Sequence, residues 1–211
     1  MEKYVADRIV AINVDIQNDF LPGGSLAVTE GDEVIAPLNA INAKVREEGG
    51  TVIFTGDQHP EETPHFGPDA WPVHCVAGTE GAAFAKTLDI QPGDVIIDKG
   101  MGQTDGYSGL EGVAKNGQTI EQIITPVGRE RVLVLLGGLA TEYCDLNTAL
   151  DTLNVDAKDG SIKLFIIRDA MRAVNLQPDD GEKAIAEMEA AGAVVIDSID
   201  ILTGNAYELA K

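Results

Sequence analysis

One cysteine stands where it could act as a nucleophile. The stretch GGLATEYCDLNTAL, residues 137–150, follows the uninterrupted apolar run 132–136, which is typical of a strand buried on both faces. Thr141 has a side chain suited to cap a new helix, which would place Cys144 in its first turn. Unpaired N–H groups and the helix dipole stabilise a thiolate there, so we expect the thiol pKa to lie below its ordinary value of about 8.5. A buried structural cysteine is the alternative, and this stretch alone does not separate the two.

All three histidines of the chain gather in one segment. His59 follows Asp57 in a D-x-H pair, and His65 and His74 come next. Imidazole nitrogens together with one carboxylate suit Zn²⁺, Fe²⁺ or Mn²⁺. The alternative is a loop of scattered exposed polar residues, which the concentration of every histidine in one segment disfavours. We therefore expect one divalent metal ion here, and the motif does not name the metal.

An acid and a base complete this set of reactive side chains. Asp15 ends the apolar stretch IVAINVD, and Lys99 directly follows the stretch DVIID. Taken alone, Asp15 would be a turn or capping residue and Lys99 a solvated surface lysine. Together with Cys144 they provide three groups that can act in one reaction: a thiol, a carboxylate that can take its proton, and an ammonium that holds both charges in place.

The elements that must position these residues alternate along the chain. Apolar runs predict six strands, and stretches with helical spacing separate them, beginning near Asp32, Thr119, Thr141 and Asp179. This order is typical of a three-layer α/β fold, a mostly parallel six-stranded sheet with helices on both faces, and we expect a single domain over residues 1–211. The six strands are expected at residues 9–15, 51–55, 94–98, 132–136, 163–167 and 193–196.

The predicted strands bring the reactive residues to one place. In a parallel α/β sheet, ligands bind beyond the carboxyl ends of the strands. Four of the six predicted strands end in, or are soon followed by, one of the reactive residues described above. We therefore expect these side chains to share one edge of the sheet. The residues concerned are Asp15, the Asp57–His59 pair, Lys99 and Cys144.

Charge and composition exclude several classes of partner. The 211 residues include 35 acidic and 15 basic side chains, a net charge of −20 that argues against nucleic acids and anionic membranes as partners. No apolar run comes near the length of about 20 residues that a membrane span needs. The first residues, MEKYVADR, do not resemble a signal peptide. With two cysteines there is no disulfide framework, so we expect a cytoplasmic protein. Assembly into a homo-oligomer stays open.

Several motifs together resemble a known enzyme family. They are VDIQNDFLPGGSLAV, the D-x-H pair with HF and WPVHC, DKG with YSGLEG, and GLATEYC, and they span residues 9–150. This set resembles the isochorismatase-like cysteine hydrolases, and most closely their nicotinamidase (pyrazinamidase) branch. The resemblance implies a catalytic triad of Asp15, Lys99 and Cys144. It also implies a cis peptide between Leu139 and Ala140, with an oxyanion hole from the N–H groups of Ala140 and Cys144.

The resemblance also implies a metal, a substrate and a reaction. The metal ligands would be Asp57, His59 and His74, with His65 as a fourth ligand in some members. Phe20, Trp71 and Tyr107 match the aromatic wall that holds a pyridine carboxamide. The activity implied is hydrolysis of nicotinamide to nicotinate and ammonia through a thioester, a step of NAD salvage.

Two other functions stay open on the sequence. One is a related, metal-independent amidohydrolase acting on an N-carbamoyl or ureido compound, although many such relatives lack the D-x-H and following histidine. The other is a non-catalytic metal-binding module on the same fold.

Two features depart from the family pattern: Asp145 stands where a small apolar residue is more usual, and residues 155–163 look like a polar insertion.

Overall fold

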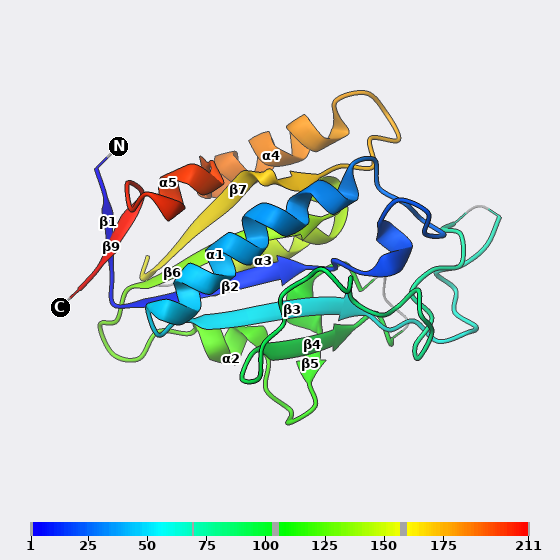
Figure 1. Ribbon diagram of the computed structural model, residues 1–211, viewed down its shortest axis with the longest axis horizontal. Helices are drawn as coiled ribbons and strands as arrows, with labels where there is room; N and C mark the ends of the chain where they lie inside the picture. Colours follow the sequence, from blue (N-terminus) through cyan, green and yellow to red (C-terminus); the bar gives the residue numbers. More distant parts are fainter. Residues whose placement is uncertain (1, 69, 103–105, 157–159, 211) are drawn as a thin grey trace.

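A seven-stranded sheet forms the centre of the protein (Figure 1). The computed structural model describes residues 2–68, 70–102, 106–156 and 160–210. All neighbouring strands of the sheet are parallel except β5, which runs antiparallel to β4. In spatial order the strands are β5 (Val113–Ala114), β4 (Val95–Lys99), β3 (Thr51–Asp57), β2 (Arg8–Val14), β6 (Val132–Leu139), β7 (Ile162–Arg172) and β8 (Val194–Ile196).

The α/β fold is confirmed, and the number of strands is corrected. All six predicted strands are present, and the seventh is the edge strand β5, which has only two residues and therefore no readable alternation. A separate small sheet pairs β1 (Tyr4–Ala6) with β9 (Tyr207–Leu209) in parallel, so that the first and the last strand of the chain lie side by side (Figure 1).

Helices cover both faces of the sheet. On one face lie α1 (Ile35–Glu47) and α5 (Ser198–Leu202), whose apolar side chains join one buried cluster. On the other face lie α2 (Ile120–Ile124), α3 (Leu146–Asp156) and α4 (Asp180–Ala191), whose apolar side chains join a second cluster. Strand β6 lies between the two clusters, and all of its residues are buried. Short 3-10 turns are η1 (Asn18–Phe20), η2 (Gly31–Val34) and η3 (Gly109–Glu111).

The helix boundaries follow local chemistry. Thr119 caps α2 in a capping box with Gln122, as its position at a predicted helix start suggests. That helix ends at Ile124, before the predicted end, because the residue preceding a proline avoids helical geometry. The polar stretch 155–163 bridges the end of α3 and the start of β7, and its residues 157–159 lie outside the described part of the chain. No helix among the described residues is long and apolar enough to cross a membrane.

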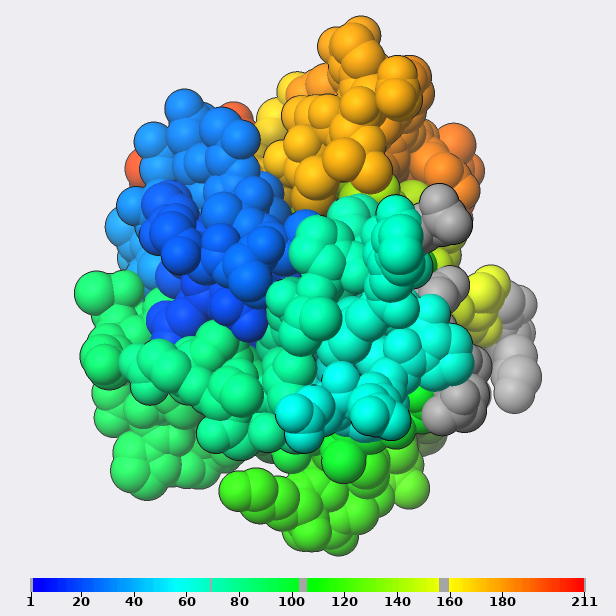
Figure 2. Space-filling model, turned by 90° about the vertical axis from the view of Figure 1, so that its right-hand side faces the viewer, coloured from blue at the N-terminus to red at the C-terminus, as the bar shows by residue number. Residues whose placement is uncertain are grey.

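The strand register places the reactive residues beside one another. Val14 pairs with Thr55 on one side and with Gly138 on the other, and Asp57 pairs with Lys99. The parallel strands β2, β3 and β4 point toward the right of Figure 1. Figure 2 looks onto this edge, where the segment between β3 and β4 crosses the strand ends. The carboxyl edge of the sheet is therefore where the site must be sought.

Candidate active site

The turn that carries Cys144 is wider than an ordinary helix start. After β6 the Leu139–Ala140 peptide is cis, as the family resemblance implied. Residues 141–145 then form a single π turn, η4 (Thr141–Asp145), in which the N–H of Asp145 donates to the carbonyl of Ala140 at 3.2 Å. The prediction that Thr141 caps the helix is wrong, because the capping position is Ala140 and Thr141 is the first residue inside the turn.

Lys99 lies at the centre of the reactive group. Its Nζ is 2.8 Å from Asp15 Oδ2, 2.6 Å from Asp57 Oδ1 and 3.4 Å from Cys144 Sγ. Nζ also donates to the carbonyl of Gly106 at 2.9 Å, so the three hydrogens of the ammonium are shared among four neighbouring atoms. The predicted Asp–Lys–Cys set is thus brought together, and Asp57 of the D-x-H pair joins it.

Asp15 is held by the backbone and by Thr55. The residue directly follows β2 and has a φ of 52°, a left-handed conformation that aspartate tolerates better than most residues. Thr55 Oγ1 donates to Asp15 Oδ1 at 2.6 Å. Asp15 is fully buried, so its carboxylate faces the cysteine and the lysine rather than water.

Burial and mutual repulsion set the proton affinities of the triad. Burial lowers the pKa of Lys99, but the Asp15 and Asp57 carboxylates outweigh this and hold it well above the ordinary value. Burial, with the Asp57 charge, raises the pKa of Asp15 against the opposing effect of Lys99. Burial and the same carboxylates also raise the pKa of Cys144, so the expectation of an easily ionised thiol is wrong. Burial therefore favours the neutral thiol of Cys144, and Asp15 offers the carboxyl group that could accept its proton.

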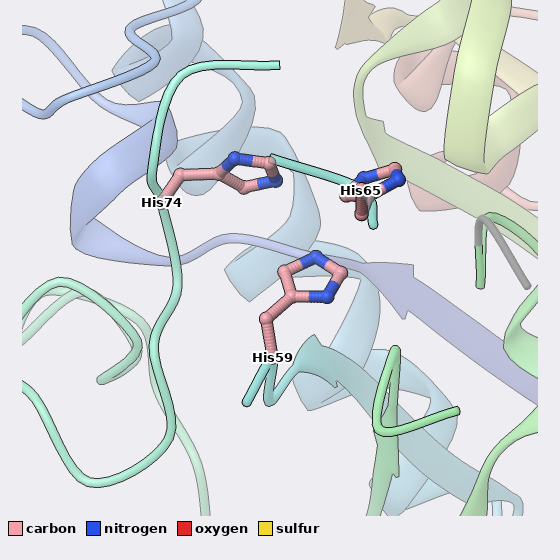
Figure 3. A group of neighbouring side chains, drawn as sticks. All are labelled: His59, His65 and His74. Carbon is pink, nitrogen blue, oxygen red and sulfur yellow. The ribbon is translucent and has the colours of Figure 1, made fainter. Parts of the chain in front are cut away.

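The three histidines face one another at the mouth of this group (Figure 3). One nitrogen of each ring lies within 4.8 Å of those of the other two. His59 Nδ1 donates to the carbonyl of Gly100 at 2.9 Å, and His74 Nδ1 donates to that of Pro72 at 2.7 Å. These bonds place the ring hydrogens on Nδ1 and leave the Nε2 lone pairs for a ligand.

Other features fit a cation among these rings. His59 Nε2 is buried, has no hydrogen-bond partner among the described residues, and lies 3.7 Å from Asp57 Oδ2. Burial lowers the pKa of His74, which keeps that imidazole neutral and able to bind a metal. Gly100 must be a glycine, since a Cβ there would lie 2.7 Å from the His59 ring. Three imidazoles and a carboxylate oxygen are a donor set that divalent transition metals accept.

A narrow pocket of about 400 Å³, including its mouth, opens above Cys144. Trp71 Nε1 donates to the Tyr107 hydroxyl at 2.9 Å, and the Trp71 ring meets Tyr143 edge-on at 5.0 Å. Phe20 packs against His74, with 5.5 Å between ring centres. All three aromatic residues predicted from the resemblance therefore line the pocket. The full lining is Phe20, Leu26, Val28, Asp57, His65, Trp71, His74, Tyr107, Ala140, Tyr143, Cys144 and Val174.

Sequence reasoning missed part of this lining. Tyr143 directly precedes Cys144, and this adjacency in the sequence was the available signal. Leu26 and Val28 lie in the loop before η2, and Val174 lies beyond β7, so only the folded chain brings them to the pocket.

Asp145 is buried directly after Cys144 in the chain. Neither of its carboxyl oxygens reaches solvent or a hydrogen-bond partner among the described residues. Burial, with the nearby charges of Asp15 and Glu142, raises the pKa of Asp145 well above its usual range against the opposing effect of Lys99. Burial therefore favours the neutral form of this carboxyl group.

Comparison with known proteins identifies the family. The profile of the isochorismatase domain matches residues 10–200. The chain belongs to the isochorismatase domain family. Within it, a nicotinamidase of Escherichia coli strain K12 is 32% identical over 202 residues, covering 86% of this chain and 91% of that one.

Solved structures of this family support the same fold. A pyrazinamidase of Pyrococcus horikoshii in complex with zinc is 36% identical, with a TM-score of 0.75, covering 90% of this chain and 99% of that one. PnC1 of L. infantum in complex with nicotinate is 28% identical, with a TM-score of 0.77, covering 99% and 98%.

Proposed function

We propose that this protein is an amidohydrolase that converts nicotinamide to nicotinate and ammonia through a thioester on Cys144. The observation that carries the proposal is the contact of Lys99 with Asp15, Asp57 and Cys144 at the floor of an aromatic pocket beside three histidines. The relatives named as nicotinamidase and pyrazinamidase support it. The charge of −20 and the absence of a disulfide framework support a cytoplasmic enzyme that binds neither nucleic acid nor membrane.

The first half of the reaction forms the thioester. The flat ring enters between the aromatic side chains, with its carboxamide carbon toward Cys144 Sγ. As sulfur attacks this carbon, Asp15 takes the thiol proton, so that no free thiolate has to form in a buried, acidic site. Backbone N–H groups of Ala140 and Cys144 stabilise the resulting oxyanion. Asp15 then returns its proton to the leaving nitrogen, and ammonia departs.

The second half regenerates the thiol. A water attacks the thioester carbon while Asp15 takes one of its protons, and the second tetrahedral intermediate collapses to nicotinic acid, which gives its remaining proton to water and leaves as nicotinate. The proton on Asp15 returns to sulfur. Lys99 keeps its own proton throughout and holds the carboxylate in place, since its pKa stays well above the ordinary value.

His59, His65, His74 and Asp57 would hold one divalent ion, Zn²⁺, Fe²⁺ or Mn²⁺. When bound, the ion supplies a Lewis acid for the ring nitrogen of the substrate and so orients the ring. The Nδ1 hydrogens of His59 and His74 are fixed by backbone carbonyls, and the buried Nε2 of His59 has no hydrogen-bond partner in the part of the chain that the structure describes; both observations support this assignment. The metal-independent reading with an N-carbamoyl or ureido substrate leaves that donor set without a role.

Ammonia release from nicotinamide tests the proposal directly. Purified protein is assayed after treatment with a chelator, and again after addition of Zn²⁺, Fe²⁺ or Mn²⁺ one at a time. We expect metal-dependent release of ammonia and of nicotinate in equal amounts. No release with any of the metals, together with release from a ureido or N-carbamoyl compound, would favour the alternative substrate class.

A further inference from the structure

One pocket wall comes from a segment far from the nucleophile in sequence. Val174 lines the pocket and packs against the core cluster below α1, and it lies in the segment between β7 and α4. That segment borders the edge of the sheet seen in Figure 2, where it is drawn in amber. The described residues between β7 and α4 form no helix or strand, so no regular backbone pairing holds Val174 in place.

The carboxylate of Glu142 provides such a contact. Glu142 lies in the π turn η4, two residues before Cys144 and next to the pocket residue Tyr143. Its two oxygens accept the backbone N–H of Val174 at 3.1 Å and that of Asn175 at 2.6 Å. Hydrogen bonds to a carboxylate are stronger than neutral ones, so this pair ties the wall to the turn that carries the nucleophile.

The same segment is held from its other side. Asn175 has a left-handed φ of 54°, and its Oδ1 accepts the N–H of Gly181 in the first turn of α4 at 2.9 Å. Just before the segment, Arg172 forms an ion pair with Glu33 of η2 at 2.5 Å. Glu142 is the contact that joins the segment to the catalytic turn itself.

We propose that Glu142 is a positioning residue that holds Val174 against the ring pocket and so determines which rings fit. The inference rests on the proposed function, since it assigns a role in recognising the ring of the carboxamide substrate. Without the carboxylate, two backbone N–H groups lose their acceptor and the segment is free to move outward. Val174 then supports the ring less well, while Cys144, Asp15 and Lys99 keep their contacts.

Steady-state kinetics of Glu142→Ala separate ring binding from chemistry. We expect the KM for nicotinamide to rise about tenfold while kcat changes less than about threefold. Relative kcat/KM for a bicyclic substrate, quinoline-3-carboxamide, should rise, because the pocket is less tightly closed. Glu142→Gln keeps one acceptor oxygen and should recover part of the loss. The control is Glu187→Ala, which removes an exposed carboxylate on α4.

A double-mutant cycle tests whether Glu142 acts through Val174. Val174→Ala should also raise KM, and the double variant should show a smaller rise than the product of the two single effects. Independent, multiplicative effects would overturn the proposal. So would a fall in kcat at unchanged KM, or a changed rate of Cys144 alkylation by iodoacetamide, since either would mean that Glu142 acts on the nucleophile.

Hydrogen exchange tests the contact without any turnover. In the ligand-free protein, Glu142→Ala should speed exchange of the Val174 and Asn175 amides at least tenfold and leave those of β6 unchanged. Unchanged exchange at Val174 and Asn175 would overturn the contact. If the wild-type protein does not hydrolyse nicotinamide, the proposed function fails, whereas this measurement still decides whether Glu142 holds the segment.

Discussion

At the scale of single residues, Cys144 and Cys75 show how place decides the chemistry of a thiol. Both are buried and unbridged. Cys144 lies 3.4 Å from the Lys99 ammonium, whereas Cys75 packs into the apolar cluster of α1. Burial raises the pKa of both thiols, so a low pKa does not distinguish Cys144, the proposed nucleophile, from Cys75. What marks it is a carboxylate and an ammonium within reach.

Replacing the proposed nucleophile should abolish turnover and leave binding intact. We expect Cys144→Ala to lower kcat at least about 10⁴-fold, because no other group in the site can carry the acyl intermediate. Zn²⁺ affinity, measured by competition with a chelating dye, should stay within about threefold of the wild-type value. Cys75→Ala is the matched control and should keep activity within about tenfold. Comparable turnover by Cys144→Ala would exclude covalent catalysis by this residue.

Asp145 should make stability fall as the pH rises. Folding raises the pKa of Asp145 above the value of about 3.9 that an aspartate has in the unfolded chain. Its contribution to the stability of the fold is therefore fully present below about pH 3.9, and it is lost as the pH rises toward the pKa of the folded state. Asp145→Asn removes the titration and keeps the shape. We expect its Tm to exceed that of the wild type at pH 8 by about 2–4 °C, or roughly 1 kcal/mol, with a smaller difference at pH 5.

The control for this comparison lies on the same helix. Asp151→Asn makes the same substitution at a partly exposed position of α3, so it reports the effect of the amide replacement away from the buried site. A Tm difference for Asp145→Asn that is equal at pH 5 and pH 8 would show that Asp145 keeps the same charge in the folded and unfolded chains.

At the scale of elements, Gln17 extends the pairing of β2 and β3 beyond the strand ends. The side chain is fully buried, and its Oε1 accepts the N–H of Asp57 at 2.8 Å. Its Nε2 donates to the carbonyls of Asp57 and Ala82, at 2.8 and 2.7 Å. One amide group thereby holds the end of β3, and with it the carboxylate proposed as a metal ligand.

Removing only the donors of this amide should weaken both the fold and the metal site. Gln17→Glu keeps the shape but turns an acceptor toward two carbonyl oxygens, so we expect a loss of roughly 2–4 kcal/mol in the free energy of unfolding, measured with urea. Zn²⁺ affinity should fall as well. The control is Gln122→Glu, whose oxygen only accepts a hydrogen bond in the capping box of α2 and should be tolerated. Equal midpoints for Gln17→Glu and wild type would contradict this role.

The sequence predicted those elements whose signal is local and repeated. Six strands are readable because fully buried strands are long apolar runs, as β6 is. Strand β5 is not readable, because two residues carry no period. The π turn was missed because Thr141 has the side chain of a helix cap, and one extra residue in a turn leaves no pattern. The triad and histidines were predictable from strand ends and motifs, whereas Val174 reaches the pocket only through contacts between distant segments.

At the scale of the whole molecule, the excess of negative charge is left without cationic partners. The 15 lysines and arginines cannot neutralise 35 carboxylates. Several arginines are already engaged in ion pairs, such as Arg46 with Asp94 at 2.6 Å and Arg131 with Asp7 at 2.8 Å, and Lys99 is buried in the site. The remaining carboxylates repel one another in the compact fold, and unfolding increases their mean separation.

Salt should therefore stabilise the protein near neutral pH. Raising NaCl from 0.1 to 1 M shortens the screening length from about 10 to about 3 Å, so we expect the Tm at pH 7.5 to rise by several degrees. The same titration near pH 4.5, close to the isoelectric point of 4.3, should change the Tm much less, because repulsion is then nearly absent. Both series are run with a chelator, so that metal binding does not contribute. A Tm that falls with NaCl at pH 7.5 would contradict this prediction. It would mean that the stabilising ion pairs, which salt also weakens, outweigh the repulsion among unpaired carboxylates.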